Sequence, residues 1–322
     1  MTYTSRKLIA ALLLAVTTGS ASSITLEKIK FGDMNNWVTR TVGESKIIGG
    51  KKMTIYEIGP TQTIPGENKA YTPLGGSPWG TSNVYAHVKG VNKGSNAVFP
   101  ADRGGGNKCA KLCSMIESLK VLGMINMNVM VSGSIFLGQM MEPIKSTSNP
   151  YGKMNMGMPY TKRPKALVFD YKVDMPANNT RTKATGFGSK KTLQGRDAAV
   201  VFMYLQRRWE DEKGNLHAKR VGTAGRKFTT GSGWVNGYQL PIHYGDYSKQ
   251  KGYQSWLGLR SKENSYYARN SKGKLVPVIE EGWDDANATP THVVLMMSSG
   301  SGEAYVGTEG LTFYVDNVAF GL

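Results

Sequence analysis

Two carboxylates, Asp170 and Glu281, have the surroundings best suited to chemistry on a sugar. Asp170 follows Phe169 in an alternating segment and falls on its polar face, whereas Glu281 lies in the acidic sequence Glu-Glu-Gly-Trp-Asp-Asp over residues 280–285. Glycoside hydrolysis usually needs two carboxylates, one as acid and one as base or nucleophile. Acidic residues are scarce here and no pair has a diagnostic spacing, and a solvated loop explains the 280–285 run more simply than catalysis does.

Aromatic residues in polar company are the second candidate feature. The chain holds 6 Trp, 16 Tyr and 9 Phe, and one polar, Gly-containing stretch from 244 to 267 contains Tyr244, Tyr247, Tyr253, Trp256, Tyr266 and Tyr267. Aromatic rings stack on the apolar face of a pyranose, while amides, guanidinium groups and carboxylates bind its hydroxyls. We therefore expect this stretch to supply a sugar platform, although packing of each ring against a loop is the simpler explanation for any single one.

Four further residues are candidate sugar contacts. Trp79 and Asn83 lie at an expected loop–strand junction, and Trp283 lies in the acidic loop. Arg163 precedes the Asp170 strand, where its guanidinium group could bind a carboxylate or vicinal hydroxyls. An ion pair between Arg163 and Asp170 or another neighbour is an equally good interpretation.

Asp33 and Asp316 suggest a different chemistry, a structural calcium site. Asp33 follows the first expected strand and Asp316 lies in the last one. Ca²⁺ takes six to eight oxygen ligands from carboxylates and backbone carbonyls, and adjacent first and last strands would bring these two together. The alternative is that Asp33 caps a turn and Asp316 faces solvent. The four His residues are dispersed and show no zinc spacing.

The elements expected to position these residues are strands. Glycine is abundant, with 39 residues, and short apolar runs are separated by Gly, Asn, Ser and Pro, which is typical of an all-β sandwich or barrel. The organising strand is 166–173, where Leu167, Phe169, Tyr171 and Val173 share one face. We expect the apolar run 197–207 to be a core strand beside it.

The chain begins with a targeting pattern. Arg6 and Lys7 precede an apolar run from 8 to 16 and small residues up to 23, a pattern typical of a cleaved signal peptide over 1–23. No Cys follows that run, so no lipoprotein anchor is expected, and no later segment is apolar enough to span a membrane. We therefore expect a secreted or periplasmic protein.

The net charge of +17 favours an anionic partner. For a protein outside the cytoplasm we expect an acidic polysaccharide or the anionic envelope surface, and no nucleic acid. Scattered lysines on an ordinary surface would give the same charge. If residues 109–113 form a strand, Cys109 and Cys113 lie too far apart for a disulfide, and we expect two buried thiols on one face. A disulfide would need a helical or turned segment there, and a metal pair would lack a nearby His or further Cys.

Five motifs in order resemble a known family, the putative carbohydrate metabolism domain (PCMD) family of Bacteroidetes. They are the segments 79–83 (WGTSN), 109–112 (CAKL), 133–138 (GSIFLG), 163–171 (RPKALVFDY) and 311–318 (LTFYVDNV). The resemblance covers about residues 75 to 322. It implies a jelly-roll β-sandwich similar to carbohydrate-binding modules, a role in glycan handling outside the cytoplasm, and glycoside hydrolysis as a candidate activity.

These observations predict one jelly-roll domain over residues 24–322, with residues 24–60 as N-terminal strands of the sandwich and a weak boundary near 60–79. The expected function is glycan binding in carbohydrate metabolism. A glycoside hydrolase using Asp170 with a second carboxylate is one alternative, and a structural or adhesive envelope protein is another. No cofactor is expected apart from the calcium ion.

Overall fold

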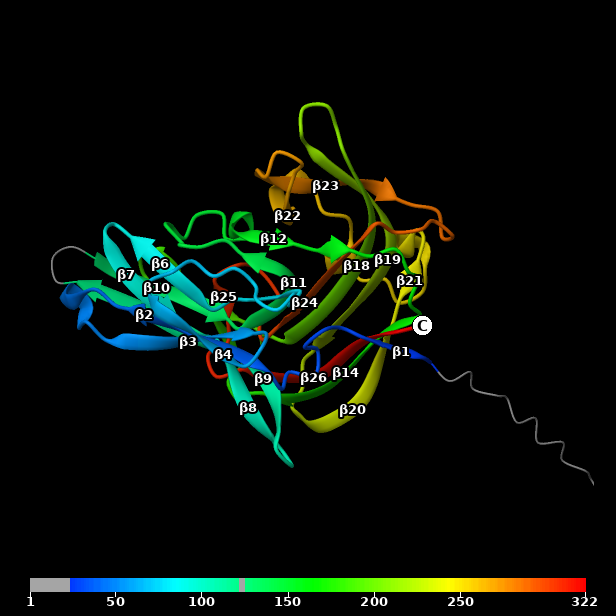
Figure 1. The fold of residues 1–322 in the computed structure, drawn as a ribbon. Coiled ribbons are helices and arrows are strands. Elements are labelled where there is room, and N and C mark those ends of the chain that lie inside the picture. The colour runs from blue at the N-terminus through cyan, green and yellow to red at the C-terminus, as the bar shows by residue number, and fades with distance from the viewer. Residues whose placement is uncertain (1–23, 122–124) are drawn as a thin grey trace, which may run out of the picture.

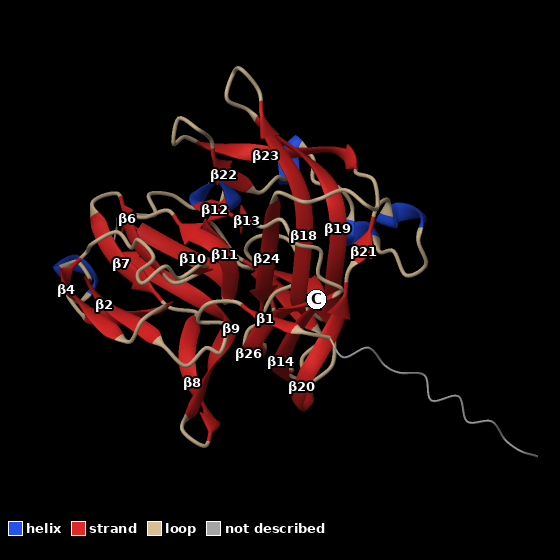
Figure 2. Cartoon of the chain, turned by 45° about the vertical axis from the view of Figure 1, so that its right-hand side comes forward, coloured by secondary structure: helices blue, strands red, loops and turns tan. Residues whose placement is uncertain are grey.

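The structure is a computed structural model that describes residues 24–121 and 125–322. The expected signal peptide, residues 1–23, lies outside the described residues. The described chain is built from strands joined by loops and short 3-10 helices (Figure 2), so the predicted all-β sandwich is confirmed. None of these residues forms a helix long and apolar enough to cross a lipid bilayer.

Two large sheets form the body (Figure 1). Within the described residues, the eight-stranded sheet contains, in spatial order, β16 (Thr185–Phe187), β10 (Ile125–Ser132), β9 (Asn107–Val121), β26 (Thr312–Gly321), β14 (Ala166–Asp174) and β20 (Ser232–Pro241), with β1 (Leu26–Lys28) beside β26 and β8 (Val98–Gly104) beside β9. The ten-stranded sheet contains β13 (Met158–Pro159), β24 (His292–Ser298), β18 (Ala199–Glu210), β19 (Leu216–Phe228), β23 (Leu275–Trp283), β22 (Tyr267–Arg269), β12 (Met154–Met156), β11 (Ser134–Met140) and β5 (Trp79–Thr81), with β21 (His243–Tyr244) beside β19.

Smaller elements complete the described chain. The additional sheets are formed by β2 (Trp37–Gly43), β3 (Lys52–Ile58) and β4 (Gln62–Glu67); by β6 (Val84–Val88) and β7 (Val91–Ser95); and by β15 (Thr180–Lys183), β17 (Lys191–Gln194) and β25 (Val306–Gly307). The 3-10 helices are η1 (Lys46–Ile48), η2 (Tyr151–Lys153), η3 (Tyr247–Lys249), η4 (Ser255–Leu257) and η5 (Lys262–Asn264). The N-terminal residues thus divide: β1 joins the main sandwich, but β2, β3 and β4 form a sheet of their own.

Alternation along β14 agrees with the sequence prediction. Leu167, Phe169, Tyr171 and Val173 enter the core between the two sheets, and Asp170 faces the other way. The prediction that 197–207 lies beside this strand is wrong, because β18 pairs with β19 and β24 in the opposite sheet. Its run of apolar residues has a different cause: both faces of β18 are buried.

The second face of β18 is buried because the ten-stranded sheet curls over itself. Strand β11 pairs with β24 through Ser134–Phe136 and with β12 through Gly138–Met140. Strand β12 then pairs with β22, and β22 with β23, which returns to β19. In Figure 1, β12, β22 and β23 lie above β18 and β24. A second apolar core forms under this cover, separate from the core between the sheets.

Candidate functional site

A cleft of about 930 Å³ opens at the margin of the cover, a size in the range of small-molecule sites. Its floor is the outer face of the sheet, where Val200 and Phe202 of β18 and Met296 of β24 line the cleft. These side chains point outward because Val201 and Met203 occupy the core between the sheets and successive residues of a strand face opposite sides. The cleft therefore has an apolar, rigid base.

Aromatic rings form the walls. Tyr266 is buried and stacks on Phe202, with 5.5 Å between ring centroids, and Tyr151 of η2 meets Tyr266 edge to face at 5.6 Å. Trp256 of η4 and Tyr267 of β22 also line the cleft and are only half-buried. Each thus keeps part of its ring available to a ligand.

Helix η4 sits close to the sheet because position 225 of β19 is glycine. A Cβ atom there would overlap Cδ2 of Leu257 and lie 2.9 Å from Cη2 of Trp256. Leu257 is buried in the second core and Trp256 packs at its edge. Gly225 therefore sets the depth at which Trp256 is presented.

Polar groups face the same cleft. Arg260 lies over the ring of Tyr266, 4.9 Å from its centroid, and one guanidinium nitrogen donates to the Tyr204 hydroxyl at 3.2 Å. Its Nε–H has no acceptor among the described residues, but that atom has almost no accessible surface. The Arg260 side chain as a whole is half-buried and lines the cleft, so its cationic guanidinium group is near any ligand there. The Lys227 ammonium group lies 5.0 Å from the centroid of the Trp256 ring.

A buried ion pair fastens this wall to the sheet. Arg220 of β19 and Glu280 of β23 are bonded through two guanidinium nitrogens, and both side chains have no exposed surface. Glu280 also accepts the Arg260 backbone N–H at 2.8 Å, and Arg220 donates to the Leu257 carbonyl at 3.3 Å. Burial disfavours the ionised carboxylate, but Arg220 outweighs it and holds the pKa of Glu280 below its ordinary value. The pair thus positions the backbone on both sides of residue 258.

The sequence profile of the putative carbohydrate metabolism domain (PCMD) family matches residues 62–320. This chain belongs to the PCMD family. The match begins at β4 and includes every strand that forms the cleft. A crystal structure of a putative glycoside hydrolase from Bacteroides thetaiotaomicron is similar over 84% of this chain and 74% of that chain, with 18% identity and a TM-score of 0.44. That likeness is too distant to transfer residues, and no curated protein matches.

The aromatic stretch of this PCMD chain divides between cleft and core. Trp256 lines the cleft as expected, together with Tyr266 and Tyr267. Tyr253 and Trp283 instead pack at the edge of the second core and are not among the cleft-lining residues.

Tyr244 packs against the main core under Arg163, whose guanidinium carbon lies 4.1 Å from the ring centroid. Arg163 donates to the Ala288 and Ala286 carbonyls, rather than pairing with Asp170. The Arg163 guanidinium group thus links the loop at 286–288 to β21, and it is already hydrogen-bonded to protein carbonyls.

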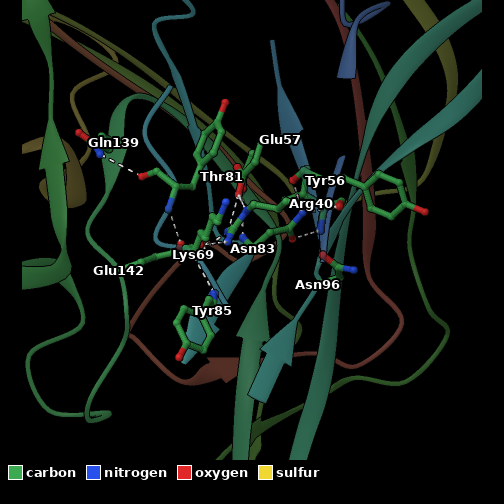
Figure 3. A network of polar contacts seen from close by, with 12 residues as sticks. Arg40, Tyr56, Glu57, Lys69, Thr81, Asn83, Tyr85, Asn96, Gln139 and Glu142 are labelled. Carbon is green, nitrogen blue, oxygen red and sulfur yellow. Dashed lines mark hydrogen bonds and ion pairs between the residues drawn. The ribbon is translucent and has the colours of Figure 1, made fainter. Parts of the chain in front are cut away.

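The expectation that Trp79 and Asn83 bind sugar is corrected by their burial, since neither has exposed surface. Trp79 lies in the main core and donates from Nε1 to the Lys30 carbonyl. Asn83 donates to the Tyr56 and Val98 carbonyls and accepts from two backbone N–H groups (Figure 3). It joins backbone segments of the N-terminal sheet and β8, which leaves no group free for a ligand.

Figure 3 also shows a buried charge cluster beside Asn83. Arg40 of β2 binds Glu57 of β3 at 2.8 Å and Glu142 at 2.7 Å, and Glu57 accepts from the Thr81 hydroxyl. Burial, partly offset by Arg40, raises the pKa of Glu57 to about 7. This cluster ties the N-terminal sheet to β5 and to the loop after β11.

Asp170 faces outward from the eight-stranded sheet but is nearly buried, with 7% of its surface exposed. Its strand register partner is Asp316 of β26, and Arg103 donates to Asp170 at 2.9 Å and to Asp316 at 2.8 Å. Burial raises the pKa of Asp316 to about 6 against the opposing effect of Arg103. The guanidinium group also lies 3.5 Å from the centroid of the Trp234 ring.

Glu281 does not come together with Asp170. It is exposed on β23 of the ten-stranded sheet, where it binds His217 Nδ1 at 2.6 Å, whereas Asp170 lies on the outer side of the opposite sheet. In Figure 1, β23 lies in the upper part of the body and β14 in the lower part, with the labels of β18 and β24 between them. The hydrolase hypothesis therefore cannot use these two residues as one pair.

For calcium, the expected adjacency exists: β1 pairs with β26, and the Val318 N–H donates to the Gly32 carbonyl at 2.8 Å. Asp33 is exposed, however, and Asp316 is bonded to Arg103. The part of the chain that the structure describes contains no group of three His, Cys, Asp or Glu that could hold a metal. The calcium site stays a prediction.

Several cleft residues were not found from the sequence, namely Tyr151, Phe202, Lys227, Arg260 and Tyr305. Arg260 lies inside the predicted 244–267 stretch and had a usable signal, a cation among aromatic residues. The others are distant in sequence and meet only because β11, β18 and β24 are neighbours. Cys109 and Cys113 are free, as expected, with Cys109 buried.

Proposed function

We propose that this protein binds a glycan outside the cytoplasm, in the cleft above β18 and β24, with Trp256 as the stacking platform. The observation that carries the proposal is the combination around one hollow of two half-buried rings, Trp256 and Tyr267, with the half-buried cationic side chain of Arg260. Rings that keep part of their surface free suit the apolar face of a pyranose, and a guanidinium donor suits its hydroxyls.

An acidic glycan fits this cleft better than a neutral one. Lys227 and Arg260 are cationic lining residues. Of the two lining carboxylates, Glu303 is paired with Lys183, whereas Glu263 accepts the Ser261 hydroxyl, which lowers its pKa and keeps it anionic. The net charge of +17 adds a long-range attraction for a polyanion. The signal peptide predicted over 1–23 would bring the protein to the compartment where such polymers occur.

Binding of purified protein to a panel of neutral and acidic polysaccharides tests the proposal by calorimetry. We expect Trp256→Ala to weaken binding of the best ligand by at least tenfold, about 1.4 kcal/mol, as is typical of a central aromatic contact. Trp209→Ala is the matched control, because Trp209 is 42% exposed and lies outside the cleft. Silence across the panel, together with binding to anionic envelope material, would instead support the adhesive-protein alternative.

The hydrolase alternative keeps one supporting observation, the Asp170–Asp316 pair. Both carboxyls are bonded to Arg103, and burial raises the pKa of Asp316 to about 6. A carboxyl group with a raised pKa is suited to general acid catalysis. Under this alternative, turnover of a panel polysaccharide is lost in Asp170→Asn and retained in Trp256→Ala. If neither the parent protein nor any variant turns over a panel polysaccharide, the hydrolase alternative is wrong.

A further inference from the structure

A second hollow of about 220 Å³ adjoins the glycan cleft. Five residues line both spaces and form the wall between them: Ser82, Val131, Met140, Pro150 and Tyr305. We call the second space the apolar chamber. It lies between the β6–β7 hairpin, β9, β10 and the loop after β11.

The chamber is lined mainly by carbon. Val84, Ala86 and Val88 of β6 face Met127 and Val129 of β10 across it, and Ile144 of the loop lies beside Ala86 through a backbone bridge. Most of these side chains are only half-buried, so their apolar surface is open to water. Apolar surface gathered in a hollow is characteristic of a ligand site.

Two of the three charged residues at the chamber wall are paired with protein groups. Lys93 donates to Glu44 at 2.9 Å and lies 3.7 Å from Glu117. Burial raises the pKa of Glu117, and the Ser118 hydroxyl donates to Asn128. Apart from Lys153, which also lines the chamber, few charged groups there remain for the hydroxyls of a second sugar.

Apolar surface continues at the outer side of the chamber. Phe187 of β16 is the register partner of Met127, so the two side chains share a face, and the Phe187 ring is 51% exposed. At the inner side, Tyr305 donates to the Thr147 carbonyl and has a φ of +64°, a backbone conformation that is unfavourable for an aromatic residue and is found at functional sites. The apolar chamber and the saccharide cleft therefore adjoin at Tyr305.

We propose that the ligand is an amphiphilic saccharide, whose sugar lies in the cleft and whose hydrocarbon group, an acyl or alkyl substituent, enters the apolar chamber. This inference rests on the proposed glycan function and adds the chemical class of the ligand. Because the two spaces adjoin across five shared lining residues, a single ligand whose chain crosses this wall fits them better than two separate ligands.

Binding of butyl, hexyl and octyl β-D-glucosides, each below its micelle concentration, tests the inference by calorimetry. Each buried methylene should raise affinity about fourfold, with D-glucose as the reference without a chain. Ala86→Phe, which fills the chamber, should abolish this dependence on chain length and leave D-glucose binding unchanged. If Ala86→Phe does not fold, as judged by circular dichroism, Val129→Asn polarises the same wall and should flatten the dependence.

Trp256→Ala separates this inference from the proposed function. We expect this substitution to weaken the binding of all glucosides by one common factor and to leave the fourfold increase in affinity per methylene intact. A chain-length dependence that is absent in the parent protein, or unchanged in both chamber variants, overturns the inference while Trp256-dependent sugar binding survives. A normal dependence without any effect of Trp256→Ala overturns the sugar platform instead.

Discussion

Replacing Arg220 by methionine should be among the most destabilising single changes in the ten-stranded sheet. The substitution leaves the Glu280 carboxylate with no exposed surface and without its cation, and breaking one side of a buried pair typically costs about 3–5 kcal/mol. Arg220 also donates to the Leu257 carbonyl, so the substitution removes a hydrogen bond that holds the segment next to Trp256. We therefore expect weaker binding at Trp256 as well as a lower free energy of unfolding.

Urea denaturation followed by tryptophan fluorescence measures the loss, with Lys52→Met as the control. Lys52 pairs with Glu67 at the surface, where their side chains are 74% and 37% exposed, so its removal should cost about 0–1 kcal/mol. In the double variant Arg220→Met, Glu280→Gln the uncompensated charge is gone, and most of the stability should return. If Arg220→Met costs no more than Lys52→Met, the pair does not hold the cleft wall.

The pH dependence of the same variant gives an independent check. In the parent protein Glu280 has a lowered pKa, so its stabilising contribution is present at neutral pH and is lost as pH falls through the folded-state pKa. In Arg220→Met, burial without a partner raises that pKa and makes ionisation unfavourable. The stability gap between the two proteins should narrow as the pH is lowered from 7.

Three further changes test other parts of the structure. Gly225→Ala should lower the free energy of unfolding by about 1–3 kcal/mol through overpacking against Leu257, and it should weaken glycan binding. Gly233→Ala, with open space around its added Cβ, should change neither stability nor binding. Equal effects of the two variants would contradict the close packing of η4 on Gly225. Trp79→Ala should lower the free energy of unfolding by about 3–5 kcal/mol, and a loss of glycan affinity without a loss of stability would show that Trp79 is a ligand contact after all. Because the pKa of Glu57 is raised to about 7, its protonated form stabilises the fold at low pH, and that contribution disappears as pH rises through 7. Thermal unfolding of the parent protein should show this fall in stability with rising pH. An equal fall in Glu57→Gln would exclude Glu57 as its source.

Local alternation and aromatic density were readable from the sequence, but long-range pairing was not. The two-residue period of 166–173 predicted correctly which side chains of β14 enter the core, because that period follows from strand geometry alone. The dense aromatic stretch 244–267 likewise pointed to Trp256. Whether a given ring is buried depends on what covers it, and nothing in the sequence around Trp79 shows that it enters the core between two sheets.

The carboxylates show the same limit. Asp170 was found on the outward face of β14, but its partners Asp316 and Arg103 come from segments far along the chain. The cover over the second core depends on β11 pairing with both β24 and β12, a closure that no local pattern encodes. The aromatic cleft exists only because of that closure, so its floor residues could not be identified as one group from the sequence.

A crystal structure of the protein with the highest-affinity panel saccharide tests the proposed glycan site most directly. We expect a pyranose ring against Trp256, with a hydroxyl or carboxylate oxygen beside the Arg260 guanidinium group. A saccharide bound only beside Trp234 and Asp170, on the opposite sheet, would contradict the assignment of the cleft as the binding site.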